Sequence, residues 1–222
     1  MLYNFTYLLA FLVCYSHADS MLSTCQVEDI LFAVPQYQCP TNYTLFNRYN
    51  GAYCIQVFYN TTVNYTSALS QCISINATLS SIENYNEAYF ILSQSQTLSR
   101  NVSGGVWIGG LRRSVCYGSD YLKNQACQPV KTFSFYWTDG FVEGTTGFGY
   151  WMDGQPDNSA SVENCLALQS TAASWSTNST SLLLDYECSR TRAMLGYACG
   201  QPATLVEDNG DDDDYDEEED DV

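Results

Sequence analysis

The ten cysteines of this 222-residue chain constrain its fold more than any other feature. An apolar run, Tyr7–Tyr15, precedes the small residues Ser16 and Ala18, which is typical of a signal peptide over residues 1–18. The alternative, an anchor helix, is disfavoured because about 20 apolar residues are needed to cross a membrane. We therefore expect a secreted, extracellular protein without a transmembrane anchor, in which cysteines form disulfides by default. Cleavage removes Cys14 and leaves nine cysteines, so one is unpaired or pairs with another chain.

The charge of the chain lies mostly in its last residues. The sequence has 8 basic and 25 acidic residues, a net charge of −17, and residues 207–222 hold twelve of the acids. Such a segment cannot bury apolar surface, so we expect a disordered acidic tail over 202–222. The longest basic cluster is Arg112-Arg113, which disfavours nucleic acid as a partner. The single histidine, His17, lies in the signal peptide, and its loss excludes Ser-His-Asp and Cys-His catalysis and His-ligated zinc.

A leader and a hairpin open the expected mature chain. Residues 19–38 have weak patterning and contain Cys25, our candidate for the odd cysteine, as a free thiol or an interchain bridge. Asn50-Gly51 predicts a tight hairpin turn within residues 40–59. Asn-x-Ser/Thr sequons, which in a secreted protein mark glycosylated surface, lie at Asn42, Asn60, Asn64, Asn76, Asn101 and Asn178.

Two amphipathic helices are predicted to follow the hairpin. Apolar residues recur at three- and four-residue steps from Tyr65 to Ile75, and Asn64 is expected to cap this first helix. Ser80 and Glu83 have capping-box spacing and predict the start of a second helix. We interpret both apolar stripes as core.

The second half of the chain predicts short buried strands around long loops. Residues 93–105 are polar and loop-like, and residues 112–131 are expected to form an insertion. Residues 132–164 show little periodicity, which is typical of a functional loop. The predicted strands are Val106–Gly110, Cys165–Leu168, Leu182–Asp185 and Gly196–Cys199.

Three motifs occur in a consistent order among the cysteines: Trp107-Ile108-Gly109-Gly110, then WMDGQPD at residues 151–157, then Asp185-Tyr186-Glu187-Cys188. Together they resemble a C-type lectin-like domain over residues 39–201. The resemblance implies an α+β fold with two helices, small antiparallel sheets and one long irregular loop. It also implies four disulfides: Cys39–Cys54, Cys72–Cys199, Cys116–Cys127 and Cys165–Cys188.

The resemblance further implies a calcium ion at the long loop, because sugars bind such lectins by completing the oxygen shell of the ion. Calcium takes 6–8 oxygen ligands. Pro156 matches the cis-proline of the family, and Gln-Pro-Asp resembles its galactose-type variant. The residues that match the family's ligands, and would contact both calcium and sugar, are Gln155, Asp157, Glu163 and Asp185.

The sequence departs from the family pattern at two points. Leu184 stands where the family has an amide ligand, and a leucine side chain cannot coordinate calcium. The Trp that stacks on the sugar in galactose-type lectins has no counterpart at residues 158–161, which leaves Tyr150 or Trp151 as the aromatic candidate.

These observations favour a secreted glycoprotein that binds carbohydrate through calcium, with glycans or glycoproteins as partners. One alternative is a calcium-independent module that binds a protein through the same loop. The other is a glycosidase that uses Asp153 and Asp157 as acid and base, and we do not expect an enzyme because nothing in the sequence desolvates either carboxylate. A disulfide-linked dimer through Cys25 would raise the avidity of a weak site.

Overall fold

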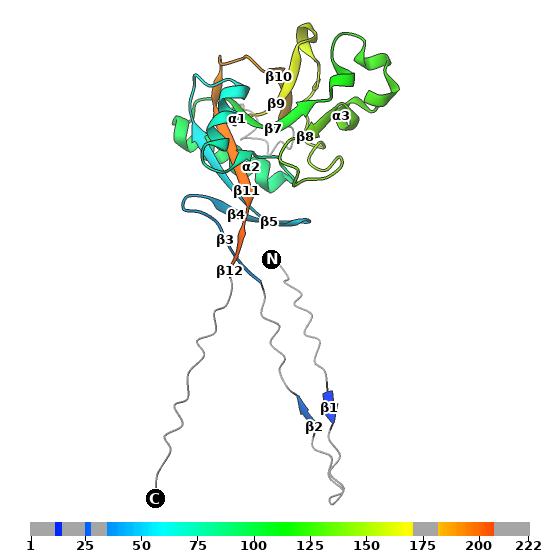
Figure 1. The fold of residues 1–222 in the computed structure, drawn as a ribbon. Helices are drawn as coiled ribbons and strands as arrows, with labels where there is room; N and C mark the ends of the chain where they lie inside the picture. Colours follow the sequence, from blue (N-terminus) through cyan, green and yellow to red (C-terminus); the bar gives the residue numbers. More distant parts are fainter. Residues whose placement is uncertain (1–11, 15–24, 28–34, 171–181, 207–222) are drawn as a thin grey trace, which may run out of the picture. The chain divides into compact units, whose positions relative to one another are not determined.

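The computed structural model describes residues 12–14, 25–27, 35–170 and 182–206, and the chain divides into two compact units, 1–36 and 37–222 (Figure 1). In the first unit, strand β1 (Leu12–Cys14) pairs antiparallel with β2 (Cys25–Val27), so that Cys14 lies opposite Cys25. Most of the expected signal peptide, and residues 207–222 of the expected tail, lie outside the described residues. Among the described residues no helix has the length and apolar character that a membrane span requires.

The second unit is built on one large sheet whose main path runs β10-β9-β7-β11-β5-β4. Two short strands join it at the side, because β6 pairs with β11 and β8 pairs with β7. The pair β7 and β11 is parallel, and the other pairings in this sheet are antiparallel. The strands are β4 (Thr44–Arg48), β5 (Gly51–Tyr59), β6 (Thr78–Leu79), β7 (Gly104–Arg112), β8 (Phe135–Trp137), β9 (Glu163–Ser170), β10 (Leu183–Glu187) and β11 (Met194–Pro202).

The predicted hairpin and the first helix are confirmed. Strands β4 and β5 pair around Asn50-Gly51, and Gly51 has a φ of 119°, which only glycine adopts readily. Helix α1 (Tyr65–Ile73) begins after Asn64, whose side chain accepts a hydrogen bond from Ser67 N at 2.9 Å. The local pattern is therefore sufficient to place both elements.

The predicted start of the second helix is wrong by four residues. Helix α2 (Tyr85–Ser99) has Asn84 as its N-cap, which accepts from Glu87 N at 3.1 Å, while Glu83 N donates to the Glu87 side chain at 2.7 Å. Asn84 and Glu87 therefore have the spacing of a capping box in the places expected for Ser80 and Glu83, with Glu87 accepting from the N–H of the residue before the N-cap. Ser80 instead continues the sheet, because its N–H donates to Ala198 O at 2.9 Å.

Helix α2 also extends into residues 93–105, which the sequence indicated as a loop. Ser95 and Ser99 are buried, and their hydroxyls donate to the carbonyls of Leu92 and Gln96 within the helix. These hydroxyls are satisfied by helical backbone, so polar composition alone does not end the helix here.

The core lies on both faces of β7. Val106 and Ile108 pack in one cluster with residues of α2 such as Ile91, whereas Trp107 packs in a second cluster with residues of α1 such as Ala68. Successive side chains of a strand point to opposite faces, which explains why neighbours in the sequence belong to different clusters. Trp107 is fully buried.

An insertion with little regular structure follows β7. It contains three 3-10 turns, η1 (Ser114–Cys116), η2 (Tyr121–Lys123) and η3 (Gln125–Cys127), and the short helix α3 (Val130–Phe133). A fourth 3-10 turn, η4 (Ser159–Ser161), precedes β9. The four disulfides are the pairs that the resemblance implied: Cys39–Cys54, Cys72–Cys199, Cys116–Cys127 and Cys165–Cys188.

The two ends of the described domain form a separate ribbon, which Figure 1 shows below the main sheet. Strand β3 (Gln36–Gln38) pairs with β12 (Thr204–Val206). The end of the expected leader at residue 38 and the start of the expected tail at residue 202 are therefore both structured. Pro202 is the last residue of β11, and Thr204–Val206 pair with β3 near the start of the domain.

Candidate functional site

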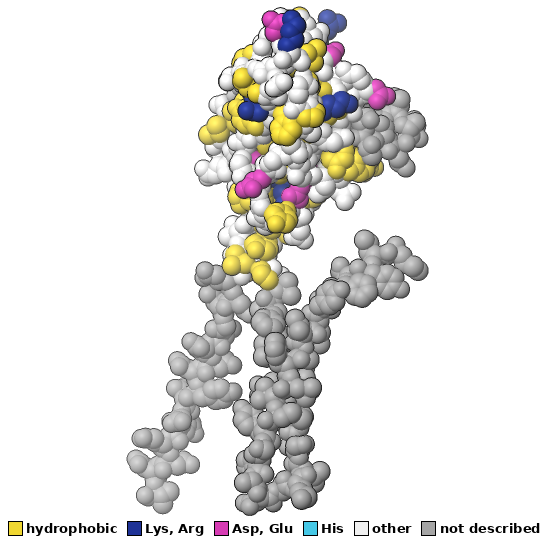
Figure 2. Space-filling view, turned by 90° about the vertical axis from the view of Figure 1, so that its right-hand side faces the viewer, with side chains coloured by type: hydrophobic (Ala, Val, Ile, Leu, Met, Phe, Trp, Pro, Cys, Tyr) yellow, Lys and Arg dark blue, Asp and Glu magenta, His cyan; other side chains and the backbone are white. Residues whose placement is uncertain are grey.

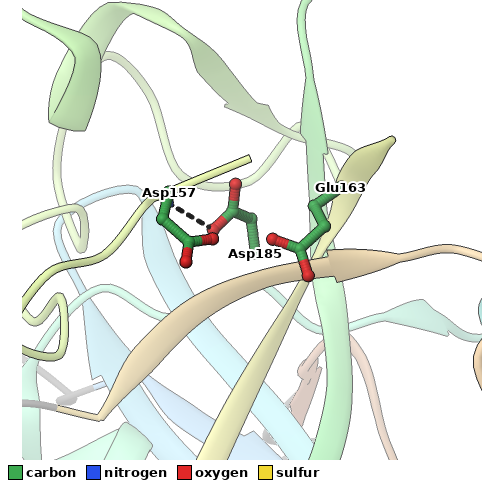
Figure 3. Close-up of side chains that lie close together, drawn as sticks. All are labelled: Asp157, Glu163 and Asp185. Atoms are coloured by element: carbon green, nitrogen blue, oxygen red, sulfur yellow. Dashed lines mark hydrogen bonds between the residues drawn. The ribbon is translucent and has the colours of Figure 1, made fainter. Parts of the chain in front are cut away.

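Three acidic side chains from three segments converge at one place (Figure 3). Asp157 follows the cis Gln155–Pro156 bond, Glu163 begins β9, and Asp185 lies on the neighbouring strand β10. One carboxylate oxygen of each lies within 4.8 Å of the others. Asp185 is fully buried, Glu163 is 9% exposed, and Asp157 is exposed. Three of the four residues predicted to bind calcium are thus brought together.

The fourth predicted residue, Gln155, lies two positions before Asp157. Its side-chain oxygen Oε1 is buried and has no hydrogen-bond partner among the described residues. A buried carbonyl oxygen without a partner is costly, and a cation or a water molecule can satisfy it. Three converging carboxylates, with an unpartnered acceptor two residues before one of them, offer the kind of oxygen donors that calcium prefers.

Asp185 has partners of its own. Its Oδ1 accepts a hydrogen bond from Asp157 N at 3.1 Å, and its Oδ2 accepts from Asn158 N at 3.0 Å. Its Oδ2 also pairs with Nη2 of Arg112, a fully buried residue at the end of β7. Burial raises the pKa of Asp185, and the positive charge of Arg112 opposes this effect. Since a guanidinium stays protonated in proteins, Asp185 has a permanent counter-charge.

Arg112 was not among the predicted site residues. It lies on the same face of β7 as Val106 and Ile108, because alternate residues of a strand share a face, and that face is buried. The alternation of residues along the strand could have indicated that Arg112 is buried. A buried arginine requires a carboxylate partner, so its role near an acidic site could have been predicted. The sequence does not indicate that the partner is Asp185, which is 73 residues away.

Glu163 and Asp157 interact with each other. Burial raises the pKa of Glu163 to about 7, helped by the hydrogen bond that the protonated Glu163 donates to Asp157. The N–H of Ser159, at 2.8 Å from Glu163 Oε2, opposes the shift. Two carboxylates this close repel each other, and a proton or a cation bound between them relieves the repulsion. The Asp157–Glu163 side of the cluster is therefore short of positive charge.

The insertion after β7 contacts the acidic cluster through Asn158. The Asn158 side chain donates to Gly118 O and accepts from Glu163 N, both at 3.1 Å. Asn158 is only 4% exposed, so it links the insertion to β9 rather than facing solvent. The Cys116–Cys127 disulfide closes the segment that contains Gly118.

The remaining candidates of the sequence occupy other places. Leu184 is buried opposite Ala167 and supplies no ligand atom. Trp151 is 5% exposed and donates from Nε1 to Lys131 O at 2.8 Å, so it is a core residue and not a surface for a sugar ring. Tyr150 is half-buried and packs near Tyr85. Of the two aromatic candidates, Tyr150 is the one with an exposed surface.

Asp153, the proposed partner of Asp157 in a glycosidase, is exposed and is not part of the cluster.

The basic side chains of the described residues are scattered. On the face shown in Figure 2, the Lys and Arg side chains of the described residues stand apart from one another among apolar and polar ones. This face presents no continuous basic strip among those residues.

This combination of a disulfide-bonded α+β fold and an oxygen-lined loop defines a C-type lectin domain. Residues 37–202 match the family model described as C-type lectin domain-containing protein 141/158, and the chain belongs to that family. Domains of this class are binding modules, and the chain is not an enzyme. Its four disulfides are typical of extracellular proteins.

Similar proteins agree with this assignment. Ladderlectin of Oncorhynchus mykiss is 27% identical over 146 residues, which are 64% of this chain and 61% of that protein, so the chain matches less than two thirds of its length. Two solved structures have a TM-score of 0.50. The EPNH mutant of CEL-I is 21% identical, with 76% of this chain and 99% of that one covered. The C-type lectin domain of murine dendritic cell inhibitory receptor 2, in complex with N-glycan, is 17% identical, with 74% and 99% covered. At these identities both show the fold alone.

Proposed function

We propose that this chain is a secreted, glycosylated lectin that binds carbohydrate through a calcium ion held mainly by Gln155, Asp157 and Glu163. The observation that carries the proposal is the convergence of the Asp157, Glu163 and Asp185 carboxylates. The buried, unpartnered Oε1 of Gln155, two residues before Asp157, supports it. Glycans or glycoproteins are the partners. The Gln-Pro-Asp triplet, by its resemblance to galactose-type lectins, favours galactose-like sugars.

The donor set fits calcium, but hydrogen bonds already occupy most of the lone pairs of Asp185. A carboxylate has about four lone-pair sites. Three sites of Asp185 already accept hydrogen bonds, from Asp157 N, Asn158 N and Arg112. Asp185 therefore offers calcium at most one oxygen, and Leu184 offers none. With three full ligands and one partial ligand, we expect an affinity at the weak end of the roughly 10⁻⁴–10⁻³ M typical of extracellular modules.

Secretion and glycosylation are parts of the same proposal. The signal-peptide pattern of residues 1–18 supports secretion, and the disulfides fit an oxidising compartment. The described sequon asparagines are exposed or half-exposed, which is the position that glycan attachment requires. They are Asn42, Asn60, Asn64, Asn76 and Asn101.

A second candidate function is calcium-independent binding of a protein by the same loop. The observation that favours it is the Arg112–Asp185 pair, because a cation of the chain itself already neutralises the most buried carboxylate of the cluster. In this case Asp157 and Glu163 contact the partner directly.

A glycan array probed with the mature chain separates the two candidates. We expect binding to galactose-bearing glycans in calcium above about 10⁻³ M and its loss in EDTA. Asp157→Asn should abolish the signal, whereas Asp153→Asn, which removes the same charge from an exposed position outside the cluster, should retain it. Glycan binding that persists in EDTA would contradict the calcium site. The absence of glycan binding, with a protein ligand retained in EDTA, would favour the second candidate.

A further inference from the structure

Arg112 ends strand β7 as a fully buried cation next to the acidic cluster. Besides its ion pair with Asp185, it donates from Nε to Glu163 O at 2.9 Å. Two aromatic rings enclose the guanidinium, since its central carbon lies 4.4 Å from the ring centroid of Phe135 and 4.8 Å from that of Tyr121. A charge at this depth is costly unless it is paired, so the pair with Asp185 is required once Arg112 is present.

Asp185 in turn fixes the backbone of the loop. Its two oxygens accept the N–H groups of Asp157 and Asn158. A buried carboxylate needs a positive charge close by in order to remain ionised and to accept such bonds strongly. In this chain that charge is covalently part of the protein, and a change in calcium concentration does not remove it.

The insertion keeps this cation away from water. Tyr121 is 7% exposed and packs with the disulfide-bonded Cys116 and Cys127. The same insertion contacts the loop, because Gly118 O accepts a hydrogen bond from the Asn158 side chain. The disulfide-braced segment therefore covers Arg112 and contacts the loop that Asp185 organises.

We propose that Arg112 is the resident counter-cation of Asp185: it holds the loop backbone at Asp157 and Asn158 in its binding conformation without calcium, and it lowers the affinity of the cluster for calcium. The inference rests on the proposed function in two respects: that this loop is the binding site and that the cluster binds calcium. Arg112 is a positioning residue, which acts on ligand and ion through Asp185.

Hydrogen exchange of the unmodified mature chain gives the first test. The amides of Asp157 and Asn158 should exchange at the same rate, within about twofold, in EDTA and in saturating calcium, because their acceptor is fixed by Arg112 in both. Exchange that is faster in EDTA by about tenfold or more would overturn the proposal, since the loop would then depend on calcium.

Arg112→Met gives the second test, because it retains much of the side-chain length and removes the charge. In EDTA we expect the two amides to exchange at least about tenfold faster, and calcium to restore their protection. Calcium titration by calorimetry should show about tenfold tighter binding, because a positive charge is removed and Asp185 becomes a full ligand. Lys123→Gln, which removes an exposed cation from the same insertion, should change neither quantity. Unchanged protection of the amides in EDTA, or calcium affinity that does not rise, would overturn the proposal.

Asp185→Asn takes the place of Arg112→Met if the latter does not fold. It keeps the size of the side chain and removes the charge, so both amides should exchange faster in EDTA and in calcium alike. Unchanged exchange would overturn the proposal. If none of the proteins binds calcium, the proposed calcium site fails, while amide protection in EDTA still decides the role of Arg112.

Discussion

The raised pKa of Glu163 predicts that calcium binding depends on pH in a defined way. Without a cation, burial and the hydrogen bond that protonated Glu163 donates to Asp157 raise the pKa of Glu163 from 4.5 to about 7. Calcium binds the ionised carboxylate, so below pH 7 each ion that binds must displace a proton. For one group with a pKa of about 7, the apparent affinity at pH 6 is about tenfold lower than at pH 8, or about 1.4 kcal/mol.

Isothermal titration calorimetry at pH 6 and pH 8 measures this difference directly. Titrations in two buffers of different ionisation enthalpy count the protons released, and we expect nearly one per calcium at pH 6 and close to none at pH 8. Glu163→Gln should bind calcium more weakly and lose the pH dependence, whereas Asp153→Asn should keep it. An affinity that is equal at the two pH values, with no proton release, would refute the coupling of Glu163 to the ion.

Three further predictions concern stability and assembly. Replacing Cys72 and Cys199 by serine should lower the free energy of unfolding by about 5 kcal/mol in urea, because the bridge closes a separation of 127 residues. Glu87→Gln should lower it by about 3 kcal/mol, because it leaves the buried charge of Arg48 with only the more distant carboxylate of Asp139, at 3.8 Å. The mature chain should migrate as a dimer on a non-reducing gel and as a monomer after Cys25→Ser; a monomer before the change would contradict an interchain bridge.

Matched variants control the two stability predictions. Replacing Cys116 and Cys127 opens a bridge with a separation of only 11 residues, so the chain-entropy loss should be about 3 kcal/mol. Equal losses for the two bridges would contradict the loop-length argument. Lys123→Gln breaks an exposed pair with Asp120 and should cost no more than about 1 kcal/mol. A loss as large as that of Glu87→Gln would show that burial is not the cause.

Local patterns predicted the elements whose determinants are close together in the sequence. Asn50-Gly51 and Asn64 each specify a turn or a cap through their own backbone neighbours, and both are where the sequence indicated. The start of α2 differs because Ser80-x-x-Glu83 and Asn84-x-x-Glu87 fit the same spacing rule. The choice between them depends on distant contacts.

Those contacts involve the second buried ion pair of the domain. Arg48 pairs with Glu87 through two hydrogen bonds of 2.9 and 3.0 Å, and its guanidinium also donates to Ser81. Glu87 can reach Arg48 because it lies in the first turn of α2, and Ser81 can do so because it precedes the helix. A pairing across 39 residues has no local signature, so the sequence pattern could not select the second box.

In the candidate site, too, some residues are predictable from local motifs and others depend on distant contacts. The Gln-Pro-Asp triplet, Glu163 and Asp185 are recognisable by motif, and the fold brings the three acids together. The role of Arg112 depends on the pairing of β9 with both β7 and β10, on Tyr121 of the insertion and on Phe135 of β8, which no motif specifies. The sequence therefore predicts the oxygen donors, but it does not predict that Arg112 already pairs with one of them, Asp185.

A crystal structure of the mature chain grown in calcium tests the central claim most directly. The account predicts an ion bound to Gln155 Oε1 and to the carboxylates of Asp157 and Glu163, with Arg112 still paired with Asp185. Crystals grown in saturating calcium that contain no ion between Asp157 and Glu163 would contradict it, as would an ion that displaces Arg112 from Asp185.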